Sequence, residues 1–207
     1  MARSPEIETT VVAHHPGGDI RTTRPVPEAG DIWDRARTVG RDLSGPLTIG
    51  ETIPGGTTTA LGVCRALGEE IGVSSSLPDN PLEAKHRLVS EGLKRSDLSP
   101  GDLVGTPREA IKYQGDPVLA GVAGLAEGAS STGASVTLAG GTQMLAVVAL
   151  LHHAGVEGSI EVATTSYVAD DPATDLHRVA DAFDVDVTVT DPGFEQCDHP
   201  GLSRFAA

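Results

Sequence analysis

Apolar and polar positions along this 207-residue chain alternate between the periods of strands and helices. Short apolar runs bounded by Gly or Pro predict strands at 46–50, 135–139, 159–165 and 185–189. Between them, apolar residues recur at three- and four-residue spacing, which predicts helices over 31–43, 57–71, 80–93, 117–125, 142–151 and 172–183. This alternation predicts an α/β fold of the three-layer, Rossmann-like type, in which a mostly parallel sheet carries helices on both faces.

The two ends of the chain lack such a pattern. Residues 1–30 are rich in Pro, Gly and charge, and we expect an irregular arm with one candidate strand at 8–13. Residues 31–207 form one α/β domain, and we expect it to be incomplete at its C-terminus because 191–207 holds Pro and Gly and adds no closing element. The polar stretch 94–114 predicts a surface excursion with a short helix.

The stretch between the first strand and its helix is built like an anion-binding loop. Gly55 and Gly56 allow a backbone path that is closed to residues with a Cβ atom, and Thr57 or Thr58 can cap the following helix. The unpaired amides at the start of that helix, together with its dipole, suit a phosphate or a carboxylate. A glycine-rich turn that merely closes a strand–helix unit is the alternative.

The spacing Gly50-x-x-x-x-Gly55 resembles a nucleoside-triphosphate loop, but Gly56 stands where that loop has lysine. Because nothing in the loop then neutralises the β- and γ-phosphates, a monophosphate or sugar phosphate is the better ligand. Glu51 would repel phosphate if it pointed inward, so we expect its side chain to face a reacting group instead.

The same pattern occurs a second time, because Gly140, Gly141 and Thr142 follow the second strand and open an apolar helix. Two such turns place two helix N-termini at one edge of a parallel sheet, where open α/β folds bind their ligands. Asp116 is expected to cap the helix that starts at Pro117, and Gly121 and Gly124 are expected to let that helix pack closely on the sheet or on another helix.

Composition excludes several classes of function. The formal charge of −14 argues against binding nucleic acid or an anionic membrane surface. The start of the chain has no signal-peptide pattern, no apolar run is long enough to cross a bilayer, and two distant cysteines form no disulfide framework. We therefore expect a soluble cytoplasmic protein. Adjacent histidines at 14–15 and 152–153 lack the i,i+4 spacing of helical metal ligands, so we predict neither a metal nor a cofactor.

Three segments together, 50–59, 115–125 and 138–144, resemble the archaeal branch of the nicotinate-nucleotide:dimethylbenzimidazole phosphoribosyltransferase family. The resemblance covers about residues 48–201, and a related Gly-Glu-Met-Gly-Ile-Gly-Asn-Thr-Thr loop is found in bacterial members. It implies transfer of phosphoribose from nicotinate mononucleotide to a benzimidazole-type or other azole base in cobalamin biosynthesis. It further implies a homodimer or a complementing chain.

The resemblance also implies roles for individual residues. Glu51 matches a glutamate with an assisting catalytic role, which is to deprotonate or orient the incoming base or to stabilise the cationic sugar. The residues implied in binding the phosphate and ribose are Ile53, Pro54, Gly55, Gly56, Thr57, Thr58, Thr59, Gly140, Gly141 and Thr142.

Members of that family are longer, and the resemblance places their principal catalytic glutamate in a C-terminal segment outside this chain. The chain is therefore expected to be feeble or inactive alone. A non-catalytic nucleotide- or sugar-phosphate-binding module is the alternative. A dinucleotide-dependent oxidoreductase ranks third, because no G-x-G-x-x-G follows a predicted strand.

Overall fold

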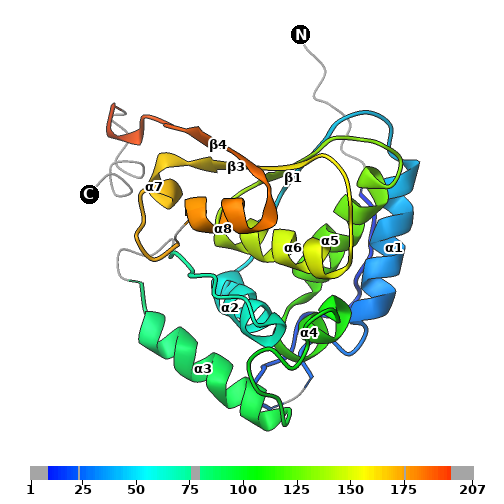
Figure 1. Cartoon of the computed structure of the whole chain (residues 1–207). Coiled ribbons are helices and arrows are strands. Elements are labelled where there is room, and N and C mark those ends of the chain that lie inside the picture. Colours follow the sequence, from blue (N-terminus) through cyan, green and yellow to red (C-terminus); the bar gives the residue numbers. More distant parts are fainter. Residues whose placement is uncertain (1–8, 23, 76–79, 175, 197–207) are drawn as a thin grey trace.

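The computed structural model of the chain describes residues 9–22, 24–75, 80–174 and 176–196. A four-stranded sheet lies at one side of the molecule, and most of the helices gather beneath it (Figure 1). The strands are β1 (Leu47–Gly50), β2 (Val136–Ala139), β3 (Ile160–Thr165) and β4 (Asp186–Thr190). The helices are α1 (Ala29–Asp42), α2 (Gly56–Leu67), α3 (Leu82–Arg95), α4 (Pro107–Gln114), α5 (Pro117–Ser130), α6 (Thr142–His153), α7 (Ser166–Ala169), α8 (Leu176–Phe183) and the 3₁₀ helix η1 (Phe194–Gln196).

All strand pairs in this sheet are parallel, and the strand order β1-β2-β3-β4 follows the chain. The α/β class and the parallel sheet are thereby confirmed. Because every crossover steps in the same direction and crossovers are right-handed, the connecting helices fall on one face of the sheet. Helices α5, α6 and α8 lie beneath that face, and α2 and α4 lie on their far side (Figure 1). Among the described residues, no helix covers the opposite face.

The alternation of burial along the strands agrees with this arrangement. Ile49, Leu138 and Val162 lie side by side in register and are buried. The residues that precede them in register, Thr48, Thr137 and Glu161, are exposed or half-buried.

Helix α1 packs so closely on α5 that the backbones of the two helices approach each other directly. A Cβ atom on Gly124 would come within 2.3 Å of the Trp33 carbonyl oxygen, and one on Gly128 within 2.1 Å of the Arg37 carbonyl oxygen. The expected close packing is therefore confirmed at Gly124. It is wrong at Gly121, where an added Cβ atom would make only an ordinary 3.6 Å contact with Val12. Across the same interface, Glu127 accepts a hydrogen bond from Trp33 Nε1 and pairs with Arg37.

Several local predictions need correction. Helix α2 is capped by Gly55 rather than by Thr57 or Thr58, because Gly55 adopts the left-handed conformation at φ 79°. The helix ends at Leu67, since Gly68 at φ 82° donates its amide to the last carbonyls. Helix α8 begins at Leu176, later than predicted.

The helix predicted from residue 80 begins instead at Leu82, and the side chain of Asn80 donates to the Val73 carbonyl and accepts from Lys85 Nζ. In the N-terminal arm, residues 9–22 and 24–28 contain no helix or strand, and Glu8 lies outside the described residues.

Candidate functional site

The two glycine turns leave the sheet at neighbouring positions. Gly50 ends β1 and Ala139 ends β2, and these two residues are partners in the parallel register. The loop 51–55 and the turn 140–141 therefore start side by side at the carboxyl edge of the sheet. This is the edge at which ligands of open α/β folds bind.

The first turn contacts the start of α6. Gly56 is the first residue of α2 and is buried, and a Cβ atom placed on it would come within 2.3 Å of Gln143 Nε2 and 2.7 Å of Ile53 Cγ2. Glycine at 56 thus permits the N-terminus of α2 to lie against the side chain of Gln143. Through this contact the structure brings the two turns together.

The second turn is tighter. A Cβ atom on Gly140 would lie 2.9 Å from Met144 Cγ, and one on Gly141 would lie 3.4 Å from Val168 in α7. Thr142 opens α6 with its hydroxyl buried, and that hydroxyl has no hydrogen-bond partner among the described residues. A buried hydroxyl without a partner is unusual and costs free energy.

Glu51 lies directly after β1, half-buried, in a cavity of about 10 Å³. Its Oε2 atom is buried without a hydrogen-bond partner among the described residues. The cavity, which is about the size of one water molecule, is lined by Glu51, Ile53, Asp116, Val118, Leu119, Val122, Gln143, Met144 and Val147. The glutamate therefore faces the gap between α5 and α6.

Asp116 is the second carboxyl in that cavity, and it is only 5% exposed. Its Oδ1 accepts from the Leu119 amide at 2.9 Å, as expected of an N-cap, and its Oδ2 accepts from Thr59 Oγ1 at 2.5 Å. Burial raises the pKa of Asp116, although both hydrogen bonds act in the opposite direction. Burial, followed by the negative charge of Asp116, raises the pKa of Glu51.

The other residues expected at the site surround these groups less closely. Pro54 and Gly55 are exposed, and Ile53 lines the cavity of Glu51. Thr57 and Thr58 are half-buried in the first turn of α2. Such a first turn presents amides that the helix itself does not use.

Sequence reasoning missed three residues near the site. Asp116 was predicted only as a helix cap, and Gln143 was given no role although it lies in the segment 138–144 that carries the resemblance. Lys85 is buried, and its ammonium group donates to the Ser74 carbonyl at 2.8 Å and to Asn80 Oδ1 at 2.9 Å. Burial lowers the pKa of Lys85. Among the described residues, Lys85 forms no hydrogen bond with a carboxylate, and its burial was detectable only from the fold.

A second cavity, of about 190 Å³, lies between the N-terminal arm and α5. It is mostly apolar, and it is lined by His15, Pro16, Pro25, Val26, Pro27, Glu28, Ile32 and Pro117. Pro117, which lines this cavity, follows Asp116, which lines the cavity of Glu51. The two cavities are therefore lined by consecutive residues at the start of α5. The arm is held there by a hydrogen bond from the Val26 amide to the Lys112 carbonyl.

Neither a metal site nor a membrane span is found in the part of the chain that the structure describes. No three His, Cys, Asp or Glu side chains are grouped there so that they could hold a metal ion. Nor does it contain a helix with the length and apolar character needed to cross a bilayer. His153 instead accepts from the Gly105 amide and contacts Glu69 at 2.8 Å.

The fold and this edge define an α/β protein with a parallel sheet and paired glycine turns at its carboxyl ends. Solved structures with this fold include two from Thermus thermophilus, a nicotinate-nucleotide-dimethylbenzimidazole phosphoribosyltransferase and CobT. They superimpose with TM-scores of 0.65 and 0.66, at 20% and 18% sequence identity, over 84% of this chain.

In sequence, the chain is similar to archaeal proteins that bear only the designation UPF0284. It is 49% identical to the protein from Halobacterium salinarum over 199 residues, 95% of this chain, and 42% identical to one from Methanosarcina mazei over 207 residues, 98% of this chain. No protein-family model matches.

These relatives are longer than the chain. The matched region makes up 60% and 59% of the two archaeal proteins, and 52% and 54% of the two solved chains. The chain thus spans about three fifths of the relatives that it matches.

Proposed function

We propose that this chain holds the phosphoribosyl part of nicotinate mononucleotide, in a transfer of phosphoribose to a benzimidazole-type or other azole base during cobalamin biosynthesis. The observation that carries the proposal is the junction of the two glycine turns, which meet through Gln143 beside the buried carboxyl of Glu51. The fold shared with the nicotinate-nucleotide-dimethylbenzimidazole phosphoribosyltransferase from Thermus thermophilus supports it.

The chemistry divides between the turns and Glu51. The amides at the start of α2 and α6 bind the phosphate, with the help of the two helix dipoles. Glu51 accepts the proton of an azole N–H while the other ring nitrogen attacks the anomeric carbon, or it offsets positive charge on the sugar. The nicotinate is a cationic pyridinium in the substrate, so its departure as the neutral ring needs no general acid.

Isothermal calorimetry on the folded chain tests the binding step. Nicotinate mononucleotide should bind more tightly than ATP, because the loop carries no lysine for the β- and γ-phosphates. Gly56→Ala should weaken binding of nicotinate mononucleotide at least tenfold, about 1.4 kcal/mol, since the added Cβ would push Gln143 away from the loop.

Gly121→Ala is the matched control, because its added Cβ meets only an ordinary contact in α5 and should leave binding unchanged. Equal affinity for ATP, or no binding of nicotinate mononucleotide by a folded sample, would refute the proposal. Glu51→Gln should keep the phosphate affinity, since the carboxyl lies in the cavity between α5 and α6.

A non-catalytic nucleotide- or sugar-phosphate-binding module is the second candidate. The same junction of glycine turns suits such a module, because binding a phosphate at the start of a helix requires no reaction. Release of nicotinate on addition of a benzimidazole separates the two candidates, because sustained turnover excludes a pure binding module.

A further inference from the structure

One buried aspartate connects three parts of the candidate site. Asp116 receives one hydrogen bond from the Leu119 amide of α5 and another from the Thr59 hydroxyl in the first turn of α2. Its carboxyl also lines the cavity of Glu51. A single side chain thus joins the start of α5, the glycine-loop helix and the expected catalytic carboxyl.

The cavity offers no cation to balance the two carboxyls. Among its nine lining residues only Glu51 from the β1 end and Asp116 from the α5 end are titratable. The other seven are neutral, namely Gln143 and six apolar residues from the loop, α5 and α6. Two negative charges in such surroundings repel each other strongly, so one carboxyl of the pair retains a proton more firmly than an exposed acid does.

Hydrogen bonding distinguishes the two carboxyls. Asp116 has a donor on each oxygen, and such donors favour the ionised form of an acid. Glu51 Oε2 has no partner among the described residues. This difference in hydrogen bonding favours the proton on Glu51 and the charge on Asp116, against the deeper burial of Asp116.

We propose that Asp116 is a positioning residue for Glu51: its fixed charge, held in place by Thr59 and Leu119, keeps Glu51 protonated to higher pH and so makes it a stronger base once it ionises. A carboxylate with this property removes a proton from an azole N–H more readily than an exposed glutamate does, because basicity rises with the pKa of the conjugate acid. The inference rests on the proposed function only for the catalytic role of Glu51.

Titration of Glu51 by NMR tests the inference on the intact chain without any ligand. The carboxyl carbons of glutamate are labelled with ¹³C, and the resonance of Glu51 is assigned by its loss in Glu51→Gln. Its midpoint should lie above that of the exposed glutamates. Asp116→Asn should lower the midpoint, because it removes the charge while the amide oxygen still accepts from the Leu119 amide and the NH2 group donates to the Thr59 oxygen, whose hydroxyl then donates to the Gly56 carbonyl.

Asp102→Asn is the matched control. Asp102 is exposed and accepts from the Ser99 amide at 2.7 Å, so this variant removes the same charge and leaves the cavity intact. It should leave the midpoint of Glu51 unchanged. A midpoint in Asp116→Asn that equals the one in Asp102→Asn would overturn the inference.

Thr59→Val provides a second test if the Asp116→Asn variant does not fold. Without the hydroxyl donor, Asp116 holds its own proton to higher pH, so Glu51 should titrate at lower pH than in the unmodified chain. An unchanged Glu51 midpoint would contradict the inference. Failure to bind nicotinate mononucleotide would refute the proposed function, yet it would leave this titration result standing.

Discussion

The two faces of the sheet meet very different surroundings. On the face toward α5 and α6, Leu138 and Val162 are fully buried, and the carboxyls of Glu51 and Asp116 lie at its end in a small cavity. On the other face, Glu161 and Asp186 stand in register and are exposed. Parallel sheets are usually covered on both faces, so the polar face is the unusual one.

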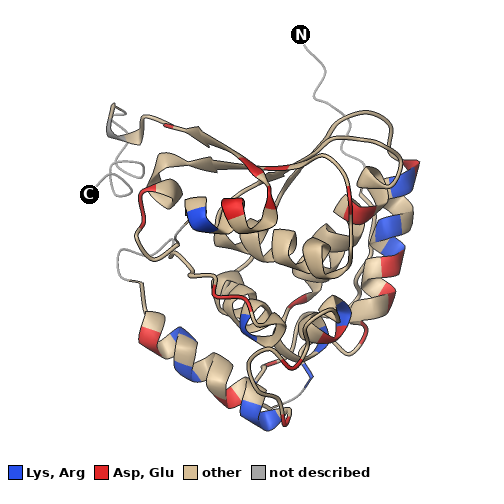
Figure 2. Ribbon diagram, viewed as in Figure 1, with Lys and Arg blue, Asp and Glu red and all other residues tan. Residues whose placement is uncertain are grey.

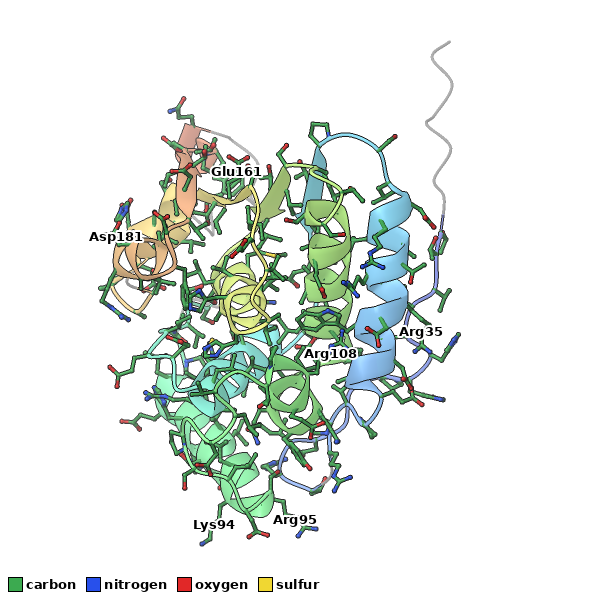
Figure 3. The ribbon with its side chains drawn as sticks, turned by 45° about the vertical axis from the view of Figure 1, so that its right-hand side comes forward. Arg35, Lys94, Arg95, Arg108, Glu161 and Asp181 are labelled. Carbon is green, nitrogen blue, oxygen red and sulfur yellow. The ribbon has the colours of Figure 1, made fainter. Side chains whose placement is uncertain are left out.

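The basic side chains are unevenly distributed over the molecule as well. The four strands contain no Lys or Arg, and the basic side chains lie mainly on the helices, above all α1 and α3 (Figure 2). Glu161 lies at the end of the molecule opposite Lys94 and Arg95 (Figure 3). The open face of the sheet is therefore acidic, in a chain that spans only about three fifths of its relatives.

The largest expected effect concerns the covered face. Leu138→Ala should lower the free energy of unfolding by about 3 kcal/mol, because it removes buried methyl groups and leaves a cavity under α5 and α6. Urea denaturation measures the change. Thr48→Ala on the open face should stay within about 0.5 kcal/mol of the unmodified chain, and equal losses in both variants would erase the contrast between the faces.

The second expected effect is a dependence on pH. Burial raises the pKa of both Glu51 and Asp116 above their values in the unfolded chain. Their contribution to stability is therefore fully present below about pH 4, where the carboxyls of the unfolded chain are protonated. It is lost as the pH rises through the raised pKa values that the two carboxyls have in the folded chain.

Asp116→Asn should thus gain stability relative to the unmodified chain as pH rises through this window. Urea denaturation at several pH values measures the difference, and Asp102→Asn corrects for the loss of one net charge. A difference between the two variants that stays constant with pH would contradict the buried carboxyl pair.

The smallest expected effect concerns the open face. Glu161 and Asp186 are partners in the β3–β4 register, and like charges in that position are unfavourable. Asp186→Lys should raise the free energy of unfolding by about 0.5 kcal/mol, and added salt should weaken the gain. A gain that is insensitive to salt would show that repulsion between the two carboxylates is not its cause.

Much of this fold could be predicted locally. The cap formed by Asp116 and the close packing at Gly124 follow from residue types alone, and both are present. The predicted end of α2 lies four residues beyond the observed one at Leu67, because Gly68 and Gly72 are equally good stop signals in the sequence. Only the packing shows that Gly72 serves another purpose, since a Cβ there would lie 1.7 Å from the Ala173 carbonyl oxygen.

The site was harder to predict. Glu51 and Asp116 are far apart in the sequence, and no local pattern indicates that α5 brings them into one cavity. The open face was missed for a related reason. Apolar strands such as 135–139 suggested burial on both sides, whereas the strand order, which places all crossovers on one side, is a property of the whole chain.

The pairing of α1 with α5 has a consequence for the order of folding. Trp33 and Glu127, which bond across this pair, are separated by 94 residues. Closing so long a loop is slow compared with forming either helix, because contacts distant in sequence delay folding. During synthesis, α1 must therefore wait until α5 has left the ribosome before the glycines of the pair can bring the two backbones together.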